Sequence, residues 1–402
     1  MSYSSFHEPD ADPTPRPGLL GRLARGRRGM VAGAAVAAIV VAVVAVYLAD
    51  ASAGPEPSNV DNAAGYTAPP AGQAQAGAAA GVSATGSASA APSASAASSA
   101  AATQKAAVGG WIPVDRAAWK AQSDAYKALA VDPVPAGVGN LPEFRADCQY
   151  SHSLADDPIV FPGLAGSSHM HSFVGNKAVN ANTTAGDLTK FTATTCKPVL
   201  DHSSYWVPTL YDIASGKPVE TTGFRVYYRS LRSTSTGMMP IPNGLRIIAG
   251  DAKKQQPTPR GSTGQFYCAF YGPGDLDGVA RSSNGNWPIC GEPATLHFML
   301  QFPDCWDGEH LDSPNHKDHM AFGSGSGCPS SHPVRIPAIT FDIQYGAKGT
   351  PQGYYLSSDK EGKSASSMHG DAFVVWDVTT MNKRTKNCVA QRRTCDNNGY
   401  QK

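Results

Sequence analysis

The chain of 402 residues carries 33 Lys and Arg against 32 Asp and Glu, a net charge of +1. This balance excludes the basic field expected of a nucleic-acid-binding protein and the acidic field of a cation store. Sequence up to about residue 106 differs in composition from the rest. About 300 residues therefore remain for folded structure, enough for one large β domain or two small ones.

The N-terminal segment predicts a membrane anchor. Residues 1–29 form a basic tail that precedes an uncharged apolar run at residues 30–49. The tail ends with Arg22, Arg25, Arg27 and Arg28. Such a run, at about 1.5 Å per residue, spans the roughly 30 Å hydrocarbon layer as a helix. We expect a single-pass cell-membrane protein with its N-terminus inside and its domain extracellular. The alternative is a signal peptide cleaved near Ala53, which would leave a secreted protein.

A linker and a folded domain follow the apolar run. Residues 50–108 are mostly Ala, Ser, Gly, Pro and Gln, and they bury too little apolar area to offset backbone entropy. We expect a disordered linker there and an extracytoplasmic β-rich domain at residues 109–402. An apolar stripe predicts a helix at the start of this domain, through Trp111, Val114, Ala118, Ala121, Ala125 and Leu129.

Beyond residue 140 a period of two dominates. Three segments alternate between two faces: FRVYYRS at 224–230, TLHFMLQF at 295–302 and AITFDIQY at 338–345. GLRIIAG at 244–250 and DAFVVWDV at 371–378 add two more short strands. Alternation bounded by Gly, Pro and Asn predicts antiparallel sheet with one buried face. We expect a mainly β fold, an antiparallel β-sandwich or jelly-roll-like domain with long loops and disulfides.

The cysteines agree with export. All eight follow the apolar run: Cys148, Cys196, Cys268, Cys290, Cys305, Cys328, Cys388 and Cys395. An even number on the exported side predicts up to four disulfides. Many pairings are open, although short separations favour Cys305–Cys328 and Cys388–Cys395. A zinc–thiolate site is the alternative, but C-x-x-C spacing is missing from the sequence.

Histidines and acidic residues gather in three segments. DDPIVFPGLAGSSHMHSFVGN places two histidines at i and i+2, on the same side of a strand. CWDGEHLDSPNHKDHMAF places two at i and i+3, neighbours on a helical turn, and SMHGDAFVVWD contains His-x-Asp. We expect metal ligands at His169, His171, His316 and His319, an acid–base pair at His369 and Asp371, and one divalent ion, zinc, copper or calcium. The alternative, favoured for the second segment, is that these side chains hydrogen-bond loops and turns.

Aromatic residues suggest a second kind of contact. Tyr205, Trp206 and Trp306 stand among Asp, Ser and Asn in SSYWVPTLYD and FPDCWDGEH. Flat rings beside hydrogen-bonding groups suit sugar faces, so these three residues are candidate sugar contacts. The alternative is that the rings belong to the core, where most Trp and Tyr of β proteins lie. The sequence lacks a P-loop, a G-x-S-x-G elbow and an H-E-x-x-H motif, which weakens nucleotide-binding, serine hydrolase and zincin interpretations.

Several long motifs in the same order resemble an uncharacterised secreted family, domain of unknown function number nineteen-ninety-six. They are the three His-rich segments with DHSSYWVPTLYD and CPSSHPVRIPAITFDIQY, and the likeness runs from about Asp147 to Cys388. The resemblance implies export and disulfides, and some relatives carry WSC modules associated with cell-wall glycans. It implies no established activity or cofactor. The histidines that match the family motif are His169, His171, His316, His319, His332 and His369. The chain departs from the family near DAFVVWD, which lacks the usual glycine before the Trp.

These features predict a membrane-anchored or secreted cell-surface domain that binds or processes polysaccharide through a His-rich metal or acid–base site. The expected partners are the membrane, through residues 30–49, and cell-envelope or environmental polysaccharide, with no nucleic acid. The alternative is a non-catalytic structural or adhesion module displayed on a flexible stalk. Convergence of the histidines favours the first hypothesis, and their dispersal favours the second.

Overall fold

The computed structural model describes residues 110–256, 266–269, 280–283, 287–325, 327–360 and 366–400. The expected tail, membrane anchor and linker lie outside the described residues. Within these ranges, no helix combines the length and the apolar composition that crossing a membrane requires.

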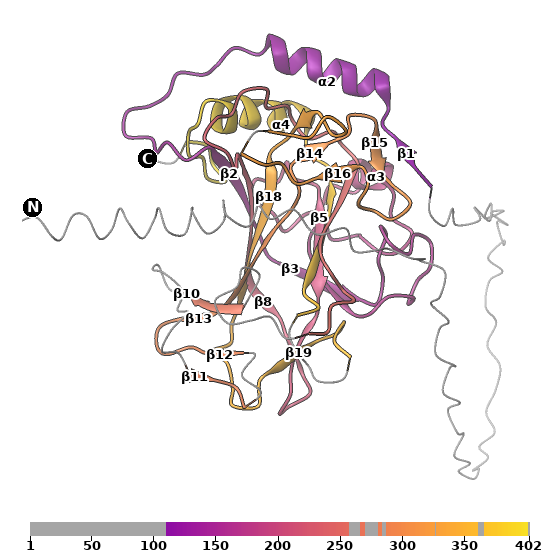
Figure 1. Cartoon of the computed structure of the whole chain (residues 1–402), viewed down its shortest axis with the longest axis vertical. Helices are drawn as coiled ribbons and strands as arrows, with labels where there is room; N and C mark the ends of the chain where they lie inside the picture. The colour runs from indigo at the N-terminus through magenta and orange to yellow at the C-terminus, as the bar shows by residue number, and fades with distance from the viewer. Residues whose placement is uncertain are drawn as a thin grey trace, which may run out of the picture. The chain divides into compact units, whose positions relative to one another are not determined.

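Two five-stranded antiparallel sheets form the body (Figure 1). The first sheet has, in spatial order, β10 (Phe266–Ala269), β13 (Thr295–Gln301), β18 (Ala338–Tyr345), β8 (Thr221–Arg229) and β2 (Glu143–Cys148). The second has β3 (Tyr150–Leu154), β4 (His171–Gly175), β5 (Ser204–Pro208), β20 (His369–Val374) and β9 (Leu245–Gly250). The expected mainly β, antiparallel fold is confirmed.

Alternating side chains of both sheets meet in one core. Leu296 and Phe298 of β13 and Val374 of β20 are buried in the same cluster. The rings of Tyr205 and Phe341, one from each sheet, pack edge to face with centroids 5.6 Å apart. Because burying a large apolar side chain stabilises a fold by roughly 1.5–3 kcal/mol, this shared core holds the two sheets face to face.

Short strands of the described residues form four smaller sheets in addition to the two five-stranded sheets. One pair is β1 (Ile112–Pro113) with β15 (His310–Asp312), and another is β11 (Ala280–Arg281) with β12 (Pro288–Ile289). Two three-stranded groups are β16 (Met320–Ala321), β14 (Cys305–Trp306) and β17 (Val334–Arg335), and β19 (Tyr354–Leu356), β6 (Leu210–Asp212) and β7 (Pro218–Val219).

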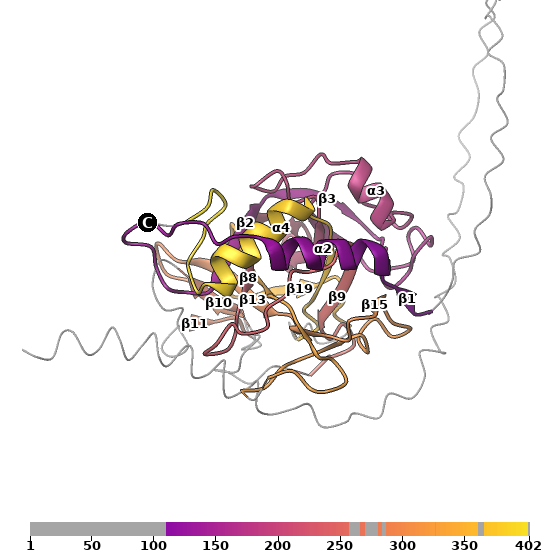
Figure 2. The same cartoon turned by 90° about the horizontal axis from the view of Figure 1, so that it is seen from above.

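The helical segments are α2 (Arg116–Ala128), α3 (Ala185–Lys190), α4 (Val378–Arg384) and the π-helical turn η1 (Thr385–Ala390). Helix α2 confirms the predicted helix and lies beside α4 (Figure 2). The predicted apolar stripe is correct at Val114, which lies in the core just before the helix, but wrong within α2. The alanines of the stripe are exposed, and the buried residues of α2 are Gln122, Ser123 and Tyr126. Gln122 Nε2 donates to the carbonyl of Ile241 at 3.0 Å and Tyr126 Oη to that of Met238 at 2.9 Å. Hydrogen bonds as well as apolar contacts therefore attach this helix.

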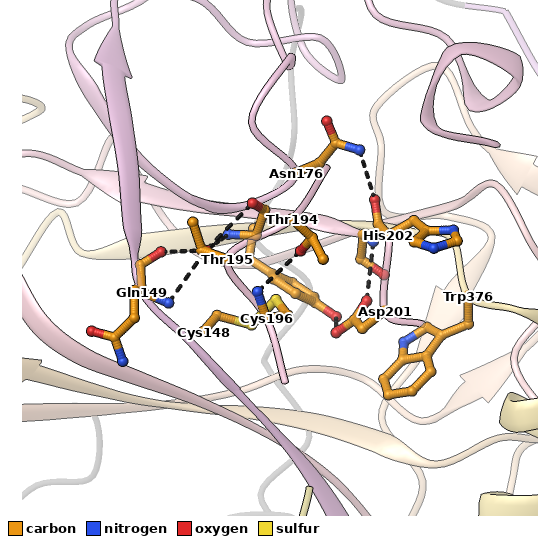
Figure 3. The surroundings of a disulfide bond; sticks show 12 residues. Cys148, Gln149, Asn176, Thr194, Thr195, Cys196, Asp201, His202 and Trp376 are labelled. Carbon is orange, nitrogen blue, oxygen red and sulfur yellow. Dashed lines mark hydrogen bonds between the residues drawn. A yellow bond between two sulfur atoms is a disulfide. The ribbon is translucent and has the colours of Figure 1, made fainter. Parts of the chain in front are cut away.

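Four disulfides join the eight cysteines: Cys148–Cys196, Cys268–Cys290, Cys305–Cys328 and Cys388–Cys395. Both favoured pairs are confirmed. Cys148–Cys196 spans 48 residues, and Figure 3 shows it beside Asp201. The loop it closes covers the outer face of the second sheet, where a second apolar cluster includes Leu188 from the loop and Phe173 and Trp206 from the sheet.

Candidate metal centre

The second sheet brings two of the His-rich segments together. His171 is the first residue of β4 and pairs with Pro208 of β5, while Asp371 of β20 pairs with Trp206 of the same strand. Continuing that antiparallel register by two residues places His369 level with Pro208. Since side chains at i and i+2 of a strand share a face, His171, His369 and Asp371 all project from one face of the sheet.

The loop before β4 is held by a buried carboxylate. Asp156 accepts hydrogen bonds from the backbone N–H of Gly166 at 2.8 Å and of Ala181 at 2.9 Å. The carbonyl of Met170 accepts from the N–H of Thr209 at 2.9 Å. These bonds fix the backbone on both sides of His169, so its ring points at the neighbouring histidines.

Three imidazoles converge. His369 Nε2 lies 3.1 Å from His169 Nε2 and 3.4 Å from His171 Nε2. One nitrogen from each ring lies within 4.8 Å of the other two. A tetrahedral ion with metal–nitrogen bonds of about 2.0–2.1 Å separates its nitrogen ligands by about 3.3 Å. The spacing of the three rings therefore fits a transition metal.

Backbone carbonyls set the tautomers of two of these rings. His171 Nδ1 donates to the carbonyl of Asp156 at 2.9 Å, and His369 Nδ1 donates to that of Ser367 at 2.8 Å. A neutral ring that donates from Nδ1 has its lone pair on Nε2. Two lone pairs therefore face each other between His171 and His369, an arrangement that a cation relieves. Metal-binding histidines commonly donate their second nitrogen in this way.

Burial keeps the rings neutral. His171 is fully buried, His369 is 5% exposed and His169 is half-buried. Burial, with added repulsion from His369, lowers the pKa of His169 to about 3. Burial lowers the pKa of His369 to about 4 and that of His171 well below its usual value. Deprotonated imidazoles are the form that binds metals.

Two buried carboxyl groups adjoin His171. Ligand atoms of Asp157, His171 and Asp371 lie within 4.8 Å of one another. Both carboxyl oxygens of Asp371 lack a hydrogen-bond partner within the described residues, although the residue is only 1% exposed. Burial, reinforced by Asp157, raises the pKa of Asp371 well above its usual range, and burial raises that of Asp157 to about 6. An unpartnered buried carboxyl group costs folding free energy unless a proton or a cation accompanies it.

Two of the predicted ligands do not join the cluster. Both ring nitrogens of His319 are engaged, Nδ1 by Ser313 at 3.0 Å and Nε2 by the carbonyl of Arg246 at 2.6 Å. His316 Nδ1 bonds Asp312 at 3.0 Å. Neither ring belongs to the converging set of described residues, so the predicted ligands His316 and His319 are corrected to hydrogen-bonding positions.

The loop that carries these two histidines still acts on the centre through its charge. His316 favours the ionised form of Asp157 and lowers its pKa against the larger effect of burial. Lys317 likewise lowers the pKa of Asp371 and of His369. Lys317 is therefore the group of this segment that places a positive charge near Asp371, while Asp312 and Asp318 of the same segment are acidic.

The three residues predicted as sugar contacts lie in the core. Tyr205, Trp206 and Trp306 are all 0% exposed and belong to the two apolar clusters. A sugar cannot reach these rings in the folded chain. The structure also suggests other roles for the predicted acid–base pair, His369 and Asp371. His369 lies with His169 and His171 as a candidate metal ligand, and Asp371 is buried from solvent.

Sequence reasoning missed Asp157. Its Oδ1 accepts from the N–H groups of Ile159 and Val160, each at 2.9 Å, as an acidic residue at the start of a turn does. From the sequence, only this local role in a turn can be predicted. The proximity of Asp157 to Asp371 of β20 depends on the loop folding over the sheet. The Asp-Asp pair just before an apolar PIVF run was the available signal.

The fold and the cluster together define a disulfide-bonded, mainly β domain with a buried three-histidine site. The family model described as domain of unknown function (DUF1996) matches residues 157–376, more than half of the chain, and the chain belongs to this family. The matched segment contains every residue of the cluster. Comparison with curated proteins and with solved structures returned no match.

Proposed function

We propose that this protein is a membrane-anchored or secreted cell-surface domain that binds or processes polysaccharide through one divalent metal ion. His169, His171 and His369 would hold the ion. The observation that carries the proposal is the convergence of three Nε2 atoms, two of them with tautomers set by backbone carbonyls. The two facing five-stranded sheets support classing the supporting body as a β-sandwich.

The ligand set favours zinc or copper over calcium. Imidazole nitrogen suits zinc, copper, nickel and iron, whereas calcium takes six to eight oxygen ligands. The backbone carbonyls near the cluster are occupied by ring N–H groups and so turn away from the ion. Of the three ions expected from the sequence, calcium fits these residues worst.

The neighbouring carboxyl groups balance the charge. A divalent ion among three neutral rings would bring two positive charges into a site where two of the rings are at most 5% exposed. A bound cation would favour the ionised forms of Asp157 and Asp371, which would then supply two negative charges next to His171. Buried charge is tolerated when it is compensated nearby, so the site accepts a divalent ion better than a neutral pocket would.

The open side of the centre is at His169. His171, His369, Asp157 and Asp371 are buried, and His169 is the most exposed of the cluster residues. When bound, a three-histidine zinc or copper ion supplies a Lewis acid with a free coordination position. A polysaccharide would therefore approach from the His169 side, with the neutral rings orienting the site and the buried carboxyl groups holding its charge.

The second candidate function is a structural metal site in a non-catalytic module. The observation in its favour is the burial of the cluster, because structural sites are closed whereas catalytic sites keep an open position. The two candidates differ at the fourth position. An exchangeable water near His169 supports the first, and a fourth protein ligand from Asp157 or Asp371 supports the second.

Metal analysis tests the proposal. The full-length chain is purified, dialysed against chelating resin, reloaded with zinc or copper and measured by mass spectrometry of the metal. We expect one equivalent in the parent chain and less than about a tenth of that in His169→Ala. A chain that retains no ion after reloading would contradict the proposal. Membrane fractionation and glycan-array binding of the same preparation test the anchor and the polysaccharide partner.

A further inference from the structure

A small cavity lies beside α3. Its volume is about 180 Å³. Its lining includes Asn176, Asn180, Asn182, Thr183, Asp187 and Phe191. Amide, hydroxyl and carboxylate groups thus surround one aromatic ring. The volume is below the roughly 300–1,000 Å³ of drug-sized pockets and suits a single ring-sized ligand.

Some of these polar groups serve the fold and others are free. Asn176 is committed, since its Nδ2 donates to the carbonyls of Phe191 and His202 and its Oδ1 accepts from the N–H of Ala178. In contrast, the Asn182 side chain has no hydrogen bond within the described residues, and the residue is exposed. Asp187 accepts both bonds from Thr184 with Oδ2 alone, and these bonds lower its pKa and keep it ionised. The cavity therefore offers an amide that donates and accepts and a carboxylate oxygen that accepts.

The ring of Phe191 is presented to solvent by a fixed backbone. Phe191 is 55% exposed. Its N–H donates to the carbonyl of Asp187 at 2.7 Å, and its carbonyl accepts from Asn176 Nδ2 at 2.5 Å. Two backbone hydrogen bonds hold Phe191 in place while its apolar ring stays exposed to solvent. This exposed part of the ring contributes no hydrophobic stabilisation to the fold. It provides an apolar face with little ordering left to be lost on binding.

We infer that this cavity is a binding subsite for a neutral pyranose ring. One face of the sugar would lie on Phe191, and its hydroxyl groups would bond the Asn182 amide and the Asp187 carboxylate. The carboxylate disfavours acidic sugars, because two like charges would meet. The inference rests on the proposed function for the class of ligand only, since the cavity contains none of the three histidines. It replaces the buried Tyr205, Trp206 and Trp306 as the sugar contact.

Saturation-transfer NMR with methyl β-D-glucopyranoside and the full-length chain tests the subsite. We expect saturation transfer to the ring C–H protons with a millimolar dissociation constant, and none to glycerol, which offers hydroxyl groups without a ring face. Phe191→Ala should weaken binding at least about tenfold, the loss expected for a ring contact with its apolar area. Phe322→Ala is the matched control, because Phe322 is 49% exposed and lies outside the cavity. Equal binding by the Phe191→Ala and parent chains would overturn the inference.

His169→Ala separates this inference from the proposed function. It should lose the metal and keep the saturation transfer. If instead the sugar signal disappears with His169→Ala and survives Phe191→Ala, the sugar binds at the metal centre and the subsite is wrong. If the parent chain binds no metal yet shows a signal that depends on Phe191, the subsite stands and the metal proposal fails.

Discussion

His169 Nε2 and His369 Nε2 lie 3.1 Å apart, although 200 residues separate them in the chain. One ring comes from the loop before β4 and the other from the first residue of β20, and only β5 lies between those two strands. Closing a loop of that length costs entropy, so the contact depends on the sheet rather than on local structure. The nitrogen-to-nitrogen approach gives the proposed metal centre its geometry.

Removing single rings should abolish metal binding without unfolding the chain. We expect His169→Ala, His171→Ala and His369→Ala each to lower metal affinity by at least about a hundredfold, because a two-histidine remainder cannot enclose the ion. His332→Ala is the matched control, as His332 belongs to the same family motif but bonds Ser331 and the carbonyl of Asp318. Competition against a chelating dye gives the affinities. Equal losses in the control and the cluster variants would contradict the assignment.

Asp371→Asn should separate folding from metal binding. In the metal-free chain this change removes a buried carboxyl group whose raised pKa makes the chain take up a proton on folding at neutral pH, so we expect stability there to rise by about 1–3 kcal/mol. In the loaded chain it removes charge compensation, and affinity should fall about tenfold or more. Urea unfolding with and without metal measures both effects. We expect the variant to be more stable than the parent chain without metal and to bind metal more weakly. A variant that is less stable than the parent chain both with and without metal would show that Asp371 is an ordinary structural residue.

The disulfide that closes the loop over the second sheet should matter for the metal. Cys148–Cys196 encloses 48 residues, including His169 and His171, and loop-closure entropy assigns it about 4 kcal/mol. Replacing both cysteines with alanine should lower stability by up to that amount and weaken metal binding. Cys388–Cys395 encloses only 7 residues outside the loop, and its removal should cost about 2 kcal/mol with metal affinity unchanged. Equal effects of both replacements on metal affinity would argue against the loop as the carrier of the site.

Asp201 should make stability depend on pH. It is fully buried, and burial raises its pKa from 3.8 to about 6 against hydrogen bonds from Ser203 and Tyr205. Because the folded chain holds this proton more tightly than the unfolded chain, the free energy of unfolding falls as pH rises from about 4 to about 6. The difference of about two pKa units corresponds to about 3 kcal/mol.

Asp201→Asn should remove the contribution of Asp201 to that slope and leave the contributions of Asp157 and Asp371, whose pKa values burial also raises. Urea unfolding near pH 4 and near pH 7 should show the variant gaining up to about 3 kcal/mol relative to the parent chain at the higher pH. Asp187→Asn is the control of opposite sign, since the hydrogen bonds from Thr184 lower the pKa of Asp187 and its contribution is lost as pH falls. A parent chain and Asp201→Asn with parallel pH profiles would refute the assignment.

Local patterns in the sequence were sufficient for the strands and for part of the site. Alternation in TLHFMLQF identified Leu296 and Phe298 as inward-facing, because the side-chain period of a strand is two residues. The same rule placed His369 and Asp371 on one face. Short separations were enough to favour the Cys305–Cys328 and Cys388–Cys395 disulfides.

Sequence patterns could not predict which histidines converge, because that depends on how distant strands pair in the sheet. The motif histidines look alike in the sequence, yet only His169, His171 and His369 converge, because β4 and β20 flank β5. His316 and His319 are engaged by Asp312, Ser313 and Arg246, and no period in the sequence reveals those partners.

Burial produced a second kind of error. Polar neighbours suggested sugar contacts at Tyr205 and Trp206, but both residues lie in a central strand that is covered on both faces. A strand covered on both faces buries every side chain, whatever polar residues adjoin it.

X-ray absorption at the metal edge of the zinc- or copper-loaded full-length chain tests the central claim most directly. The proposed centre predicts three imidazole nitrogens at about 2.0–2.1 Å, with the imidazole scattering reduced in His369→Ala. A spectrum with oxygen ligands alone, or one that His369→Ala leaves unchanged, would contradict a metal centre at His169, His171 and His369.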